Sequence, residues 1–156
     1  MTRFLSALPL LLALSSAHAA VVPRLAFEQL VADSPRIVHA LVVDSQVASS
    51  GEFLWTHYRL QVLDEVKGVV PAVITVSEPG ATLNGISMQV SGAIVFRAGE
   101  EVVLFLYQTP LGYWRLRGSS QGKVDVADSP SGKRIRTASN QTLTDFLAAI
   151  RREASK

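Results

Sequence analysis

The feature that most constrains the fold is a series of short apolar segments separated by turn-forming residues. Residues 36–47 are apolar and rich in β-branched side chains, and residues 53–66 alternate between apolar and polar over their middle. Residues 73–77 alternate in the same way, and residues 102–107 are almost entirely apolar. This pattern is typical of strands and predicts a mostly β domain in which residues 102–107 form a central strand.

The turn signal at residues 48–51 leaves only a short connection between the first two predicted strands. We therefore expect these strands to form an antiparallel hairpin. Residues 78–92 are the least regular stretch, and we interpret them as a long loop that contains a short strand near residues 87–90. Further strands are predicted at residues 113–116, 122–127 and 133–137.

Helices are predicted at both ends of the domain. Residues 26–32 form a short amphipathic stretch, and near the C-terminus Thr142 can cap a helix with Asp145 three residues later. The apolar spacing of that second helix is carried by Leu143, Phe146, Leu147 and Ile150. About seven short strands with a helix at each end predict a small OB-like β-barrel, for which residues 20–156 have a suitable single-domain length.

The first part of the chain, residues 1–19, predicts a secretory signal peptide. Arg3 gives a positive start, residues 4–14 are mainly apolar, and the Ala17-x-Ala19 pattern suits cleavage after Ala19. The apolar run is too short to span a bilayer, and no second apolar stretch of spanning length follows it. We therefore expect a periplasmic or extracellular protein without a membrane span.

The absence of cysteine limits how the exported chain can be stabilised and what it can bind. Without disulfides, the packed core and the backbone hydrogen bonds must hold the fold together, and zinc sites that need thiolates are excluded. Removing Arg3 with the signal leaves 14 basic and 13 acidic residues, so the charge is near neutral. Nucleic-acid binders usually carry a clustered positive excess, so we expect no nucleic-acid partner.

The two histidines that remain after signal removal, His39 and His57, do not predict a metal site. In the expected hairpin His57 lies opposite residue 42 or 43, which leaves the histidines roughly 10–13 Å apart along the strand. The two rings therefore cannot both bind the same zinc ion. The sequence also lacks a phosphate-binding glycine loop, a dinucleotide fingerprint and a metalloprotease helix motif, so we expect no cofactor.

Residues 118–122 match the G-x-S-x-G pattern of a nucleophile elbow, in which Ser120 would be the nucleophile. That motif needs a helix after the serine, whereas residues 123–126 alternate like a strand and no histidine follows Ser120. We interpret the motif as a glycine-flanked turn. A secreted hydrolase that uses Ser120 or a carboxylate is the alternative function. The candidate acidic pairs are Glu100 with Glu101 and Asp125 with Asp128.

Trp55, His57 and Arg59 share one face of their predicted strand, because alternate residues of a strand point the same way. Aromatic residues and arginine are enriched at recognition surfaces, so these three are the predicted binding residues. Tyr113 and Trp114 point to opposite faces of a later strand, and we expect one in the core and the other exposed. A second exposed aromatic residue would strengthen the binding interpretation.

Four segments follow one another in a characteristic order, namely residues 38–42, 58–68, 96–106 and 118–123. The second ends in Lys67-Gly68, and the third carries Gly99-Glu100 before an apolar strand. This order resembles a widespread set of small exported bacterial proteins and, more distantly, the netrin-like and tissue-inhibitor-of-metalloproteinase β-barrels. The resemblance implies an OB-type barrel over most of the mature chain.

The same resemblance does not extend to the chemistry of the inhibitors. They bind a protease zinc through an N-terminal cysteine that disulfides brace, and this chain has no cysteine. Fold alone is a weak guide to function. Because the core is apolar, few titratable groups could lie together and no cofactor motif is present, we expect a non-catalytic exported binding or accessory module that contacts another protein. Besides the hydrolase, an OB-type binder of single-stranded nucleic acid is a second alternative.

Overall fold

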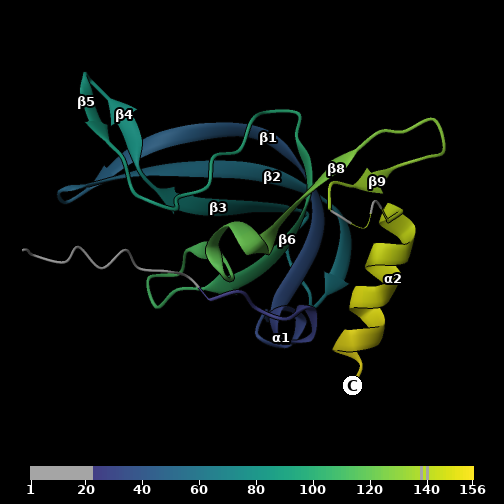
Figure 1. Ribbon diagram of the computed structural model, residues 1–156. Helices are drawn as coiled ribbons and strands as arrows, with labels where there is room; N and C mark the ends of the chain where they lie inside the picture. Colours follow the sequence, from purple (N-terminus) through teal and green to yellow (C-terminus); the bar gives the residue numbers. More distant parts are fainter. Residues whose placement is uncertain (1–22, 138, 140) are drawn as a thin grey trace, which may run out of the picture.

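Strands dominate the computed structural model, which describes residues 23–137, 139 and 141–156 (Figure 1). The predicted signal peptide, residues 1–19, and its cleavage site lie outside the described residues. The described strands are β1 (Arg36–Ser50), β2 (Phe53–Lys67), β3 (Val73–Pro79), β4 (Ala81–Leu83), β5 (Ile86–Met88), β6 (Glu101–Gln108), β7 (Trp114–Leu116), β8 (Lys123–Ala127) and β9 (Arg134–Ile135). Two helices, α1 (Phe27–Ala32) and α2 (Leu143–Ala154), flank them. The mostly β prediction is confirmed.

The first two strands form the expected antiparallel hairpin, but its register differs from the expectation. The turn lies beyond Ser50, and the ladder contains irregularities, one of them between Val42 and Asp44. His57 therefore lies opposite Gln46 instead of residue 42 or 43. Each of the two strands has 15 residues, so they extend only slightly beyond the predicted spans of residues 36–47 and 53–66.

The main sheet closes partly on itself and is barrel-like. Its strands run in the circular order β1–β2–β3–β7–β6 and back to β1. β6 pairs with β1 over residues 101–106, and it also pairs with β7 and β8. β3 and β7 are parallel and join through a single bridge between Val76 and Trp114. The ring is therefore continuous along most strand pairs and nearly open at one of them.

One hydrophobic core fills the inside of this ring. The central strand β6, which the sequence predicted correctly, contributes alternate residues to it, because Val102, Leu104 and Leu106 are fully buried there. The other buried members are Val38, Ala40, Val42, Tyr58, Leu60, Val70, Ile74, Val76, Phe96 and Leu116. Alternation along β2 and β3 therefore sends every second side chain inward and leaves the next ones on the outer face.

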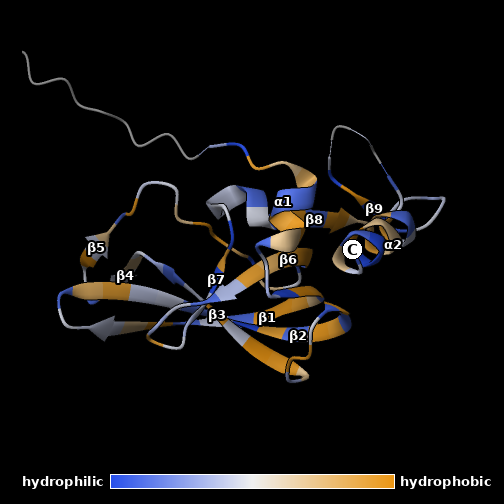
Figure 2. Ribbon diagram, turned by 90° about the horizontal axis from the view of Figure 1, so that it is seen from below, coloured by the Kyte–Doolittle hydropathy of each residue, from blue (hydrophilic) through white to orange (hydrophobic). Residues whose placement is uncertain are grey.

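A second hydrophobic core lies between the outer face of the sheet and the two helices. Val103 and Phe105 of β6 point into it, so this strand is buried on both faces. In Figure 2, α1 and α2 lie on one side of the sheet, and hydrophobic residues run along β1, β2 and β6. The helical members of the core are Leu30, Val31, Leu143, Phe146, Leu147 and Ile150. Both predicted helices are thus confirmed, with the expected buried residues on α2.

The short hairpin of β4 and β5 lies at the opposite end of the molecule from α2 (Figure 1). These two strands form a separate sheet that has no ladder pairing with the main one. The sequence predicted only one short strand within residues 78–92, so β4 was missed. Among the described residues, no helix combines the length and the apolar character needed to cross a membrane.

Candidate functional site

The three predicted binding residues lie on the outer face of β2. Their neighbours Leu54, Tyr58 and Leu60 are buried, and alternation therefore turns the intervening side chains outward. The residues at positions 55 and 57 are half-buried, whereas Arg59 is exposed. The structure thus brings Trp55, His57 and Arg59 onto one surface, as the sequence indicated.

An aromatic residue from a distant segment completes this surface. Tyr113 lies just before β7, and its ring centroid is 5.2 Å from that of Trp55 and 5.8 Å from that of His57. Its neighbour Trp114 packs against the core inside the ring. The two residues therefore lie on opposite faces as expected, but both are half-buried, so the expectation that one of them is exposed is wrong. We call Trp55, His57, Arg59, Tyr113 and Arg115 the outer aromatic face.

A hydroxyl on the neighbouring strand orients the His57 ring. Ser77 lies directly opposite His57 in the β2–β3 ladder, and its Oγ is 2.7 Å from Nδ1 of the ring. This serine–histidine pair was not predicted. Ser77 is only 1% exposed, so its oxygen is closed to a substrate and the pair positions the ring within the surface.

Arg59 extends the surface away from the aromatic rings. Its guanidinium makes a bidentate ion pair with Asp44 of β1, in which Nε donates to Oδ1 at 3.1 Å. Both side chains are about half exposed, and an exposed pair of this kind contributes little to stability. Arg59 therefore remains available to a partner at a small cost.

Arg115 connects the outer aromatic face to a buried carboxylate. Its guanidinium lies 5.9 Å from the centre of the Trp55 ring, and Nη2 donates to Oε2 of Glu78 at 3.2 Å. Glu78 is 3% exposed. Burial raises the pKa of the Glu78 carboxyl, and the charge and hydrogen bond of Arg115 only partly oppose this.

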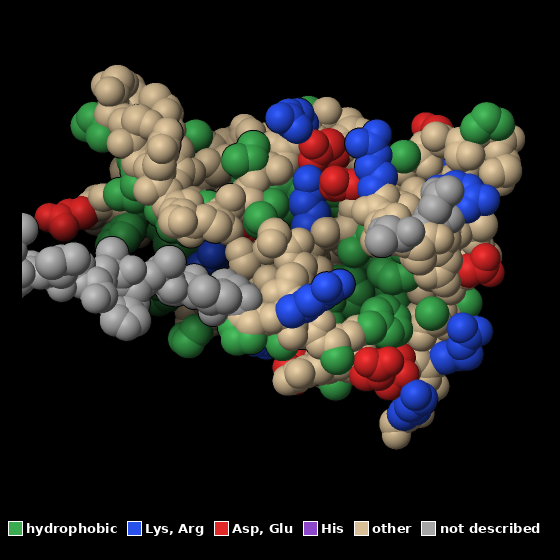
Figure 3. Space-filling model, in the orientation of Figure 1, with side chains coloured by type: hydrophobic (Ala, Val, Ile, Leu, Met, Phe, Trp, Pro, Cys, Tyr) green, Lys and Arg blue, Asp and Glu red, His purple; other side chains and the backbone are tan. Residues whose placement is uncertain are grey.

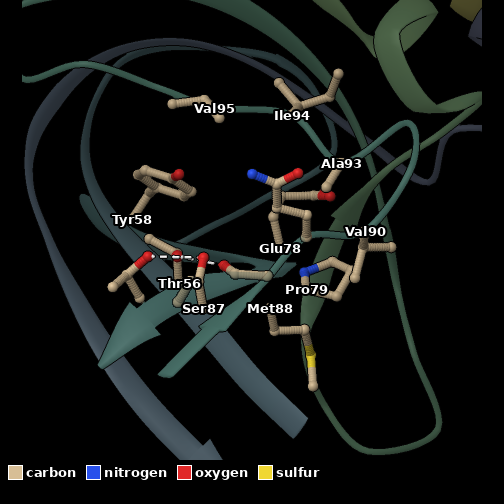
Figure 4. A pocket seen from close by; sticks show the side chains of 14 residues that line it. Thr56, Tyr58, Glu78, Pro79, Ser87, Met88, Val90, Ala93, Ile94 and Val95 are labelled. Carbon is tan, nitrogen blue, oxygen red and sulfur yellow. Dashed lines mark hydrogen bonds between the residues drawn. The ribbon is translucent and has the colours of Figure 1, made fainter. Parts of the chain in front are cut away.

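Glu78 lines a cavity of about 490 Å³ (Figure 4). The walls come from the ends of β2 and β3, from the β4–β5 hairpin and from residues 89–95. In Figure 4 the side chain of Glu78 lies among Tyr58, Ala93 and Ile94. Glu78 is the one Asp, Glu, Lys, Arg or His in this lining.

Sequence reasoning missed the cavity and Glu78 because it placed this residue at the start of a long irregular loop. A usable signal was present. Ile74 and Val76 point inward, and continuing the strand by one more residue would have put Glu78 on that same face.

The two candidate acidic pairs meet at a second, more polar cavity of about 360 Å³, which Glu100, Glu101, Asp125 and Asp128 help to line. Basic side chains already neutralise much of this charge. Lys123 lies 3.0 Å from both Glu100 and Asp125, and Lys133 contacts Glu101. Within the part of the chain that the structure describes, no three His, Cys, Asp or Glu side chains are grouped as metal ligands.

Ser120 lies in a single 3-10 turn, η1 (Ser119–Gly122), and strand β8 follows directly. The helix that a nucleophile elbow needs is not at this place. The rings of His39 and His57 bind Glu101 and Ser77 respectively, so neither is hydrogen-bonded to Ser120. The interpretation of the motif as a turn between strands is confirmed by this geometry.

Comparison of the chain with protein-family models, with curated proteins and with solved structures gives no significant match.

Proposed function

We propose that this chain is an exported, non-catalytic binding module that contacts another protein through the outer aromatic face. The observation that carries the proposal is the ring cluster of Trp55, His57 and Tyr113, which two separate segments bring together on the surface. Neither Trp55 nor Tyr113 belongs to the two hydrophobic cores. The cluster is therefore not explained by the packing of the interior.

The composition of this surface is that of a protein-binding hot spot. Aromatic and arginine side chains dominate such sites, because they combine a large apolar area with directional polar groups. The rings of the cluster hold one another in place, so a partner would order few additional rotatable bonds on binding. Arg59 and Arg115 offer donors at two sides of the rings.

The charge distribution favours a protein partner over a nucleic acid. The full chain carries a net charge of +2, and a large continuous basic surface is the usual mark of nucleic-acid binding. On the face seen in Figure 3, basic and acidic side chains lie intermixed. The arginines of the outer aromatic face are themselves partly neutralised by Asp44 and Glu78.

The proposal is tested by photo-crosslinking of the mature protein in its native envelope and medium. A photoreactive phenylalanine analogue at position 113 should yield a discrete crosslinked protein. The double variant Trp55→Ala, Arg59→Ala should then reduce affinity for that purified protein by at least about 30-fold, because it removes two hot-spot side chains.

The matched control is the double variant Val69→Ala, Arg152→Ala, which also removes one apolar side chain and one arginine from exposed positions. It should leave the affinity within about twofold of the wild type. Retained affinity in the Trp55, Arg59 variant would reject the outer aromatic face. Tight binding to single-stranded DNA that weakens steeply with salt would instead favour the nucleic-acid alternative.

A further inference from the structure

The cavity beside Glu78 has the character of a small-molecule site. Its volume of about 490 Å³ lies within the range of ligand pockets, and such pockets combine apolar walls with a few polar groups that fix orientation. Here Met88, Val90 and Ile94 are among the apolar members of the wall, and Glu78 supplies the charge. The Glu78 side chain points to the inner side of the sheet, so this cavity is separate from the outer aromatic face except at Arg115, which contacts Glu78.

One oxygen of the Glu78 carboxylate lacks a donor. Oε2 accepts a hydrogen bond from Arg115, whereas Oε1 is buried and has no hydrogen-bond partner among the described residues. The amides of Ile94 and Leu116 lie near enough to favour the charged form, but they do not complete a bond of normal geometry to Oε1. A buried acceptor without a donor is costly, so the site gains free energy when a ligand supplies one.

The charges around Glu78 indicate what charge a ligand that donates to Oε1 would carry. Arg115 is 28% exposed and already compensates the carboxylate. A cationic ligand would therefore leave an excess positive charge in a cavity of mixed polar and apolar lining, and an anionic ligand would face the carboxylate itself. A neutral hydroxyl or N–H group satisfies Oε1 without either penalty.

The hairpin that forms one wall of the cavity is only weakly tied to the main sheet. The β4–β5 hairpin has only three residues in each strand and no ladder pairing with the main sheet. Gly80, at its base, has a φ of +102°, and Gly92, beyond its far end, has a φ of +79° and accepts a hydrogen bond from Ser119. Oε1 is shielded, so a ligand reaches it only if the hairpin is displaced, which would break few ladder hydrogen bonds.

We propose that this cavity binds a small uncharged molecule with an apolar body and a single hydroxyl or N–H group, which donates to Oε1 of Glu78. The apolar body fills the space between the hairpin and residues 93–95. Met88 adapts to its shape, because an unbranched thioether side chain repacks readily. The β4–β5 hairpin closes over the bound molecule.

Menthol and menthone test this inference as a matched pair, because they share one carbon skeleton and only menthol has a hydroxyl donor. Each is titrated into ¹⁵N-labelled mature protein at about pH 8, which favours the ionised carboxylate. Menthol should give saturable amide shifts concentrated in residues 79–95. Menthone should bind about tenfold more weakly, the factor that one hydrogen bond to a charged acceptor supplies.

Two variants separate the carboxylate from the cavity. Glu78→Gln should reduce the preference for menthol to less than about threefold, because a carboxamide both donates and accepts. Val90→Trp, which fills the cavity without changing the carboxylate, should weaken both ligands by at least about tenfold. The Trp55→Ala, Arg59→Ala protein tests the outer aromatic face separately. Either proposal can therefore be rejected without rejecting the other.

Three results would overturn the inference. The first is the absence of saturable menthol binding by the wild type, and the second is equal affinity of the wild type for menthol and menthone. The third is a set of amide shifts that lies mainly outside residues 79–95. The first two comparisons need only the wild-type protein, so they hold even where the Glu78→Gln variant does not fold.

Discussion

Three glutamates show how strongly position determines the behaviour of one side chain. Burial raises the pKa of Glu78, since Arg115 opposes it only in part. Burial also acts on Glu100 and Glu101, but there the hydrogen bonds and charges of neighbouring basic groups outweigh it and lower both pKa values. Lys123 contributes to the second effect, and its own pKa is raised because its two acidic partners outweigh its burial.

Glu101 therefore makes stability depend on pH in a defined direction. Its pKa is lower in the folded protein than the ordinary value of 4.5, so its stabilising contribution is present above pH 4.5 and is lost as the pH falls through the folded pKa. Glu101→Gln should lower the free energy of unfolding at neutral pH by about 1 to 3 kcal/mol.

Urea unfolding across a pH series measures this difference between the wild type and Glu101→Gln. The difference should shrink steadily as the solution is acidified below pH 4.5. Glu52→Gln, at an exposed position in the β1–β2 turn, is the control and should change stability by less than about 0.5 kcal/mol. A difference between wild type and Glu101→Gln that stays constant on acidification would contradict the assignment.

The sequence could predict which residues of β2 share a face, but not what meets them. Trp55, His57 and Arg59 follow from a period of two residues, which is a local property. The contact of Tyr113 with Trp55 joins residues 58 positions apart and depends on how the sheet closes. Likewise, Arg115 reaches Glu78 only because β7 lies beside β3.

At the scale of single elements, the best predicted part is the C-terminal helix. Thr142 accepts a hydrogen bond from the backbone N–H of Asp145, and the apolar stripe that follows is buried against the sheet. Both the cap and the spacing are local, and they agree with each other. The β4 strand was missed because three residues beside glycine and proline carry too little periodicity to indicate a strand.

The packing of α2 on the sheet gives a test at this scale. The Phe146 ring lies 6.1 Å from that of Phe27 and 6.5 Å from that of Phe105, so it links both helices to β6. Phe146→Ala should lower the free energy of unfolding by about 3 to 5 kcal/mol, because it opens a cavity in the second core. Chemical denaturation of the purified variant measures the loss.

Phe53→Ala is the matched control, since this phenylalanine lies at the start of β2 and is 57% exposed. It removes the same atoms and should cost less than about 0.5 kcal/mol. Equal losses of unfolding free energy in the two variants would show that burial of the Phe146 side chain does not hold α2 on the sheet.

At the scale of the whole molecule, the number of strands in the main sheet was predictable and their order was not. Composition and turn signals mark where strands begin and end. The order depends on pairings such as β1 with β6, which join residues 60 to 70 positions apart. No local pattern specifies such long-range strand pairings. They form because the folded chain buries two separate hydrophobic cores at the same time.

This architecture predicts an uneven distribution of local stability. The amides of β6 lie between two cores, whereas those of β4 and β5 belong to an isolated two-stranded sheet. Hydrogen exchange in the β4–β5 hairpin should be faster than in β6 by at least about a hundredfold. Exchange measured residue by residue by NMR checks this, and equally slow exchange in both elements would contradict it.

The single backbone bridge between β3 and β7 has a consequence for heating. Every other neighbouring pair in the ring is joined by several residues, so thermal loosening should begin along this seam. The Arg115–Glu78 ion pair crosses this seam, so water that enters there would hydrate these charges and lower the cost of further separation. The Arg115–Glu78 contact, which joins β3 and β7 at low temperature, is therefore expected to mark where solvent enters as the temperature rises.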